Sequence, residues 1–100
     1  MIRGTTPTHI FKLPIETDTI RQLRITYNQC GKTVLEATEA DCTLTGQEIR
    51  FRLTQEDTLL FTPLAAVELQ IKVLTTDDNV MASRVMSLSV EKILNTEVLT

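Results

Sequence analysis

Residues that perform chemistry are scarce in this sequence. Its 100 residues include one histidine, His9, and three glycines, each of which stands alone. A single histidine with no cysteine or acid at ligand spacing provides no metal cluster, and isolated glycines provide no phosphate-binding loop. A G-x-S-x-G nucleophile motif is also missing. The sequence therefore predicts no enzyme, no catalytic residue, no cofactor and no metal site, and His9 is interpreted as a polar residue on a strand.

Cysteines are few as well. Cys30 and Cys42 are the only two, and their spacing is not the C-x-x-C of a redox motif. Cys30 precedes Gly31 at an expected turn, and Cys42 lies in or beside the next expected strand, so a bridge across adjacent strands is one interpretation. A small secreted domain that depends on disulfides usually has more cysteines. Two free thiols are the favoured interpretation, since the chain has no recognisable export signal.

Aromatic residues make up only 4% of the chain, namely Phe11, Tyr27, Phe51 and Phe61. All four are expected inside the domain, which leaves no aromatic platform for a sugar or for single-stranded nucleic acid.

Positive charge is also in deficit, because the net charge is −3 and the isoelectric point is near 5.0. Nucleic-acid binding usually needs a basic surface that neutralises phosphates. We therefore predict no nucleic-acid partner.

Long apolar runs are missing. A helix that crosses a bilayer needs about 20 consecutive apolar residues, and every apolar run here is much shorter. The opening MIRGTTP lacks the apolar core of a signal peptide. The sequence therefore predicts no membrane partner and a protein that is cytoplasmic when it is made.

Acidic residues cluster at two places without a metal-ligand pattern. Residues 77–79 lack the alternate spacing and the later glutamate of a calcium-binding EF-hand loop. Glu36, Glu39 and Asp41 also lack a spacing that would bring several oxygens onto one cation. We interpret both clusters as solvated turns or the flanks of turns.

What the sequence has in abundance is alternation of apolar and polar residues. The clearest run is 67–73, and shorter runs cover residues 11–13, 23–28, 49–54 and 86–90. A period of two places the apolar side chains on one face of a strand, and such faces need a second sheet to cover them. The sequence therefore predicts one all-β domain over residues 1–100, an immunoglobulin-like antiparallel β-sandwich of about seven strands. The expected inward-facing residues are Phe11, Leu13, Leu23, Ile25, Tyr27, Ile49, Phe51, Leu53, Leu69, Ile71, Val73, Met86, Leu88 and Val90.

Short polar segments separate the expected strands. Residues 28–32 predict a hairpin turn into a weaker strand over 33–38, and residues 76–79 are expected to join the strands at 67–73 and 86–90. Segment 54–61 breaks the alternation and predicts one or two helical turns. Thr54 is expected to cap those turns with Asp57 three residues later, and Leu60 and Phe61 are expected to plug the end of the sandwich.

Two further segments have less regular patterns. Residues 15–20 predict a helical or turn-like crossover after Pro14. Residues 91–100 contain apolar residues without strict alternation, so they are expected either to continue the last strand or to leave the domain as a short helix. An apolar chain end of this kind is expected to dock on its own domain or on a partner.

The second half of the chain resembles a family of small phage proteins. The run 52–59, RLTQEDTL, looks like the strand and helical turn of tail-associated β-sandwich domains in phages and prophages. The strand at 67–73, the acidic turn and the final strand follow in an order similar to the N-terminal domain of the phage baseplate upper protein. Residues 4–11, GTTPTHIF, resemble the opening of small prophage proteins. The chain departs from the family at residues 64–66, where LAA stands in place of a glycine.

This resemblance implies a non-enzymatic structural or interaction module of a virion, in the tail or the baseplate. Its implied partners are other phage structural proteins or further copies of the chain, and no catalytic residue carries over from the family. The alternative is an adhesion-like module that binds a peptide or a surface. That alternative predicts an exposed patch around Arg24, Arg50 and Arg52 if their strands are neighbours.

Overall fold

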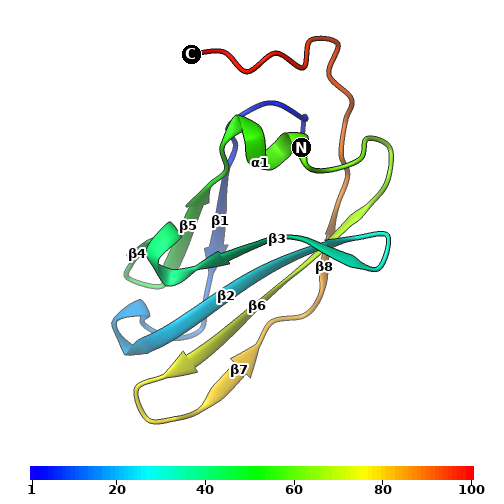
Figure 1. Ribbon diagram of the computed structural model, residues 1–100. Helices are drawn as coiled ribbons and strands as arrows, with labels where there is room; N and C mark the ends of the chain where they lie inside the picture. The colour runs from blue at the N-terminus through cyan, green and yellow to red at the C-terminus, as the bar shows by residue number, and fades with distance from the viewer.

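The chain folds into two antiparallel sheets in a computed structural model that describes residues 1–100 (Figure 1). The smaller sheet has the order β1-β5-β4, and the larger has the order β3-β2-β6, with β7 and β8 both paired to the remaining side of β6. The strands are β1 (Thr8–Lys12), β2 (Ile20–Gln29), β3 (Lys32–Thr38), β4 (Thr43–Thr45), β5 (Glu48–Arg52), β6 (Val67–Thr75), β7 (Val80–Ala82) and β8 (Met86–Leu88).

The inner faces of the two sheets share one core, which confirms the all-β sandwich. The two longest strands, β2 and β6, contribute most of the buried apolar residues. They pair with each other, and Ile25 stands opposite Ile71. The predicted inward positions Phe11, Leu13, Met86 and Leu88 are only partly buried, and they pack against the rim of the core. The immunoglobulin-like topology remains a prediction. The buried apolar residues are Leu23, Ile25, Tyr27, Ala37, Ile49, Phe51, Leu53, Phe61, Val67, Leu69, Ile71, Val73 and Val90.

A short helix, α1 (Gln55–Leu59), confirms the predicted helical turn. Thr54 Oγ1 accepts a hydrogen bond from the Asp57 amide at 3.1 Å, and the Asp57 carboxylate accepts one from the Thr54 amide at 3.0 Å, which forms a reciprocal capping box. Phe61 is buried, as predicted for the plug. Leu60 is 58% exposed, so its prediction as part of the plug is wrong. Consecutive side chains near a helix end point in different directions, and only one of these two faces the core.

Two turns form at the predicted residues, but one of them leads into a strand that the pattern did not predict. Cys30 and Gly31 have φ of 54° and 76°, as expected for a tight two-residue hairpin turn between β2 and β3. Residues 76–79 do form a turn, yet it leads into β7 and not directly into β8. The expectation that this turn joins the two long strands is therefore wrong. β7 has only three residues, too few for an alternation to stand out.

The connecting segments contain two further helical turns. The 3₁₀ turn η1 (Thr17–Thr19) confirms the crossover predicted after Pro14. A second one, η2 (Glu39–Asp41), links β3 to β4, and its Asp41 carboxylate accepts a hydrogen bond from the Thr38 amide at 2.9 Å. Asp41, one of the three clustered acidic residues, therefore has a structural role in capping this turn.

The segment after β8 forms neither the predicted continuous strand nor a helix. Glu91 makes an isolated parallel bridge with Ile2, and the Met1 ammonium group donates a hydrogen bond to the Ser89 carbonyl at 2.8 Å. Beyond this point the chain passes over α1 (Figure 1). The Gln55 side chain exchanges two hydrogen bonds with the Leu99 backbone, at 2.7 and 2.9 Å. The segment therefore docks on its own domain, which is one of the two docking sites expected for it.

Candidate functional site

Residues 77–79 lie in the turn after β6, and Glu39 and Asp41 lie in η2, as interpreted from the sequence, whereas Glu36 lies within β3. Asp77 accepts hydrogen bonds from the Thr75 hydroxyl and from the Asn79 amide group, and these bonds lower the pKa of its carboxyl. Glu39 accepts hydrogen bonds from the Leu23 amide at 3.0 Å and from Arg24 at 3.1 Å, and its pKa is likewise lowered, first by backbone hydrogen bonds. Three or more metal-ligating side chains do not converge anywhere in the structure.

The two cysteines are free thiols and do not form the bridge that the sequence left open. Cys30 lies at the hairpin turn before β3, and Cys42 follows η2 after β3, so the full length of that strand separates them. Cys42 packs against the core. Burial, together with the neighbouring Asp41 and Glu39 carboxylates, raises its thiol pKa to about 11. A thiol with a raised pKa is a poor nucleophile at neutral pH.

The three arginines of the predicted patch are not brought together. Arg24 lies on β2 in the larger sheet, where it pairs with Glu39 at 3.1 Å. Arg50 and Arg52 lie on β5 in the smaller sheet, on its solvent-exposed face. The two sheets turn their outer faces in opposite directions, so the expected three-arginine patch is wrong. The sequence does not specify the order of the strands, and in the structure β5 pairs with β1 and β4 and not with β2.

A shallow polar hollow lies on the outer face of the smaller sheet. It measures about 570 Å³ and has no apolar residue in its lining. Arg50 and Glu48 both line it and pair with each other at 3.1 Å. The other lining residues are Lys12, Thr43, Thr45, Gly46 and Gln47.

One lateral side of the sandwich is open. On the other side η2 crosses from the larger sheet to the smaller one, between β3 and β4. On the open side β1 has β5 as its only partner, and β7 and β8 have β6 as their only partner. Both sheets therefore end there in an unpaired edge, a position from which a strand of another chain can be bound.

The free hydrogen-bonding groups of β1 follow from its ladder with β5. The Pro7 carbonyl accepts from the Leu53 amide at 2.9 Å, and the Leu13 amide donates to the Gln47 carbonyl at 2.8 Å. Backbone groups alternate in direction along an antiparallel strand, so every second residue between these two bonds faces away from β5. The residues whose amide and carbonyl groups face the open side are Thr8, Ile10 and Lys12.

Apolar side chains line the gap between the two edges. A hollow of about 250 Å³ lies between the end of β1 and the β6–β7 hairpin. Leu13 and Ile15 form one wall, and Met81 forms the other, with Ile71 and Val73 at its base. The rim continues along β1 and β8 through partly buried apolar side chains. The alternation of the sequence predicts several of these residues as inward-facing, but it does not indicate that this side stays uncovered.

The side chain of His9 points inward from β1 and connects the two sheets. Its Nδ1 is 2.7 Å from the hydroxyl of the buried Tyr27, whose ring also packs against Phe51 and Phe61. Burial raises the pKa of Tyr27, so its hydroxyl keeps its proton and needs an acceptor. We therefore assign Tyr27 as the donor and neutral His9 as the acceptor. His9 is a strand residue, as predicted, but its face is the inner one.

Acidification is expected to weaken the fold through His9. Burial lowers the pKa of His9 below its ordinary value of 6.5, so the unfolded chain binds this proton more readily than the folded one. The unfolding free energy is then at its full value above pH 6.5 and decreases as the pH falls through 6.5, by no more than about 1.4 kcal/mol per pH unit for one site. Urea denaturation at a series of pH values measures this slope. A His9→Gln variant should flatten the slope between about pH 7.5 and about pH 5.5, and an unchanged slope would contradict the assignment.

Comparisons with family models, with curated proteins and with solved structures found no match to this chain. No helix combines the length and the apolar character that are needed to span a membrane. The open side of the sandwich, bounded by β1 and by β7 and β8, is the candidate site that the geometry distinguishes most clearly.

Proposed function

We propose that this domain is a non-enzymatic interaction module that assembles with other protein chains through the open side of its sandwich. The observation that carries the proposal is the combination of two unpaired strand edges with an apolar hollow between them. Exposed edges favour pairing with a strand of another chain, and uncovered apolar side chains gain stability when they are removed from water. The role proposed for the domain needs no catalytic residue.

We further propose that the assembly is a phage or prophage virion, in its tail or baseplate. The support is the resemblance of residues 52–59 and of the following strand order to tail-associated domains. One structural detail agrees with it. Leu64 has φ of 67°, a conformation that favours glycine, and it lies in the segment where the family has a glycine. The partners would be other structural proteins of the particle or further copies of this chain.

Particle fractionation tests this function. Tailed particles induced from the strain that carries the gene would be banded on a density gradient, and the fractions probed with an antibody against the protein. We expect the protein to band with the particles and to stay with them after a high-salt wash, since apolar burial is little affected by salt screening. Protein found only in the fractions without particles would contradict the virion role. Light scattering across a concentration range would then report whether the chain associates with itself.

The polar hollow supports a second candidate function, an adhesion-like module that binds a peptide or a surface. Arg50 and Arg52 lie on that exposed face with Lys12. Reversing both arginine charges should abolish binding of this kind and leave particle association intact. Particle association that is lost in the same variant would instead place the assembly surface on the outer face of the smaller sheet.

A further inference from the structure

We infer that the partner at the open side is an extended segment that pairs with β1, inserts apolar side chains beside Leu13 and Met81, and carries acidic residues that face Lys12 and Arg84. This inference rests on the proposed interaction function and specifies the chemistry of the partner. It follows from three features of the open side, namely its backbone groups, its apolar lining and its charges.

The backbone groups favour β1 as the strand that is extended. β1 presents the free amide and carbonyl groups of three alternate residues along one uninterrupted strand. The opposite edge is broken, because residues 83–85 separate the short strands β7 and β8. Short and interrupted edges are a common protection against pairing, and β1 lacks that protection. Ile10, at the centre of β1, also leaves 51% of its surface exposed.

The apolar lining determines which side chains the segment carries. A strand added to β1 continues its alternation, so every second side chain of the added strand points inward beside Phe11 and Leu13. These side chains enter the hollow of about 250 Å³ that Met81 closes from the other sheet. Valine, isoleucine or leucine at alternate positions therefore fits, and a polar side chain there would lose its hydration without a partner.

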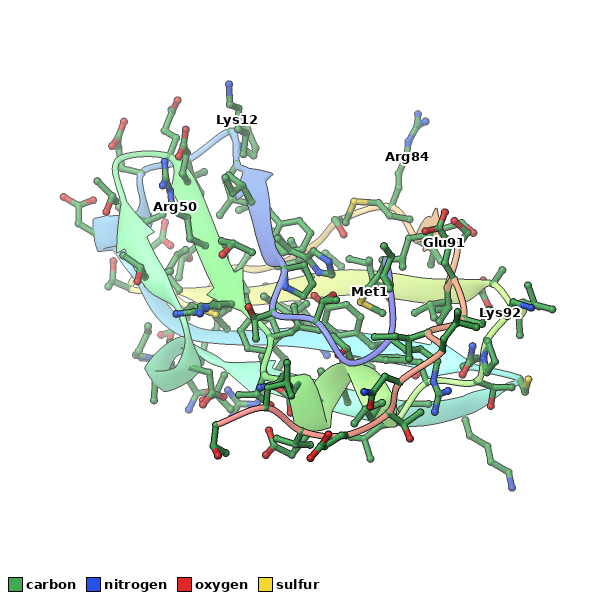
Figure 2. All side chains as sticks on the ribbon, turned by 90° about the horizontal axis from the view of Figure 1, so that it is seen from above. Met1, Lys12, Arg50, Arg84, Glu91 and Lys92 are labelled. Carbon is green, nitrogen blue, oxygen red and sulfur yellow. The ribbon has the colours of Figure 1, made fainter.

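The charges determine what the outward side chains are. Lys12 and Arg84 extend to the same side of the molecule, one from each edge of the opening (Figure 2). Neither of them pairs with a carboxylate within 4.0 Å, whereas Arg21, Arg24 and Arg50 all do.

Two acidic residues of this chain lie at the β6–β7 end of the opening, and a third, Glu48, stands opposite Lys12 on β5, where it pairs with Arg50. Glu16 and Asp77 line a neighbouring hollow that shares Ile15 and Met81 with the apolar one. An acidic segment is therefore attracted near Lys12 and Arg84 and repelled near the β6–β7 turn, which gives the bound segment a preferred placement.

A synthetic strand provides the test. The acetylated and amidated peptide TVEVTVE places valines on one face and glutamates on the other, and TVKVTVK is its charge-reversed control. Titration of each peptide into the ¹⁵N-labelled protein would be followed by NMR. We expect TVEVTVE to shift the amide resonances of Thr8–Lys12 and Met81, and to bind at low salt at least about fivefold more tightly than TVKVTVK.

Matched variants separate the contributions. Ile10→Pro removes the central free amide of the edge and should weaken TVEVTVE binding by about tenfold or more, whereas Ile10→Thr keeps that amide and should change binding by less than about threefold. Lys12→Gln combined with Arg84→Gln should remove the preference for the acidic peptide. Lys32→Gln, on the distant β3, should not. Circular dichroism would verify that each variant is folded.

The outcomes distinguish this inference from the proposed function. Binding at Thr8–Lys12 without a charge preference would overturn the acidic partner and leave the interaction function standing. Failure of TVEVTVE to shift these resonances at millimolar concentration would overturn the docking of a strand on β1. The interaction with particles is measured independently by fractionation, so its loss would contradict the virion role whatever the peptide does.

Discussion

Replacing Ile71 with aspartate is expected to unfold the domain. Ile71 is 2% exposed, lies at the centre of the longest strand pairing and stands opposite Ile25 on β2. An aspartate there would bury a carboxyl group with no cation beside it, because the surrounding core residues are apolar. Substitutions of this kind exceed about 4 kcal/mol, which is comparable with the whole stability of a domain of this size.

Thermal denaturation followed by circular dichroism measures this effect, together with the spread of amide resonances in an NMR spectrum. Gln70→Asp is the matched control, since Gln70 is the preceding residue on β6 and its side chain faces solvent. The control should keep its stability within about 1 kcal/mol of the natural protein. If Ile71→Asp melted as the natural protein does, the assignment of the inner face of β6 would be wrong.

Replacing Gln29 with leucine is expected to give the second largest loss of stability. Gln29 is 5% exposed, and its side chain forms three hydrogen bonds with the backbone of the loop between α1 and β6. It donates to the Thr62 and Ala65 carbonyls at 2.7 and 3.1 Å, and it accepts from the Thr62 amide at 2.7 Å. Leucine has a similar size but satisfies none of these groups. We expect a loss of about 2–3 kcal/mol and a melting temperature lower by roughly 10–20 °C.

Hydrogen exchange identifies the cause of that loss. The Thr62 amide should lose its protection from exchange in Gln29→Leu. Amides at the centre of β2 and β6 should lose only the protection that corresponds to the decrease in global stability. Gln22→Leu on the same strand is the control, because Gln22 is exposed. Equal effects of the two substitutions would mean that the loop does not depend on Gln29.

The local sequence around Gln29 does not indicate that this residue is buried. Its neighbours Cys30 and Gly31 are typical of a turn, and the sequence therefore predicts Gln29 as part of that turn. In the structure it is the last residue of β2 and continues the inward series of Leu23, Ile25 and Tyr27. A glutamine interrupts an apolar series, and its burial is favourable only because a loop more than 30 residues later brings backbone partners to it.

Features that depend on neighbouring residues were predictable from the sequence by itself. Alternation along β2 and β6 identified their inner faces, because a side chain's face is decided by its position in its own strand. Thr54 and Asp57 identified the start of α1, because the capping box is formed within four residues. The sandwich followed from these elements, since strands with one apolar face need a covering sheet.

The tertiary structure alone decided which strands pair and which edge is left uncovered. Four features depend on how strands that are distant in sequence pair. They are the separation of Arg24 from Arg50, the hydrogen bond between His9 and Tyr27, the three-residue strand β7 and the open side beside β1. A local pattern of apolar and polar residues is the same whether its strand lies at the centre or at the edge of a sheet. The pairing is determined by the packing of the whole core, and so the surface on which the proposed function depends could not be found before the strands were placed.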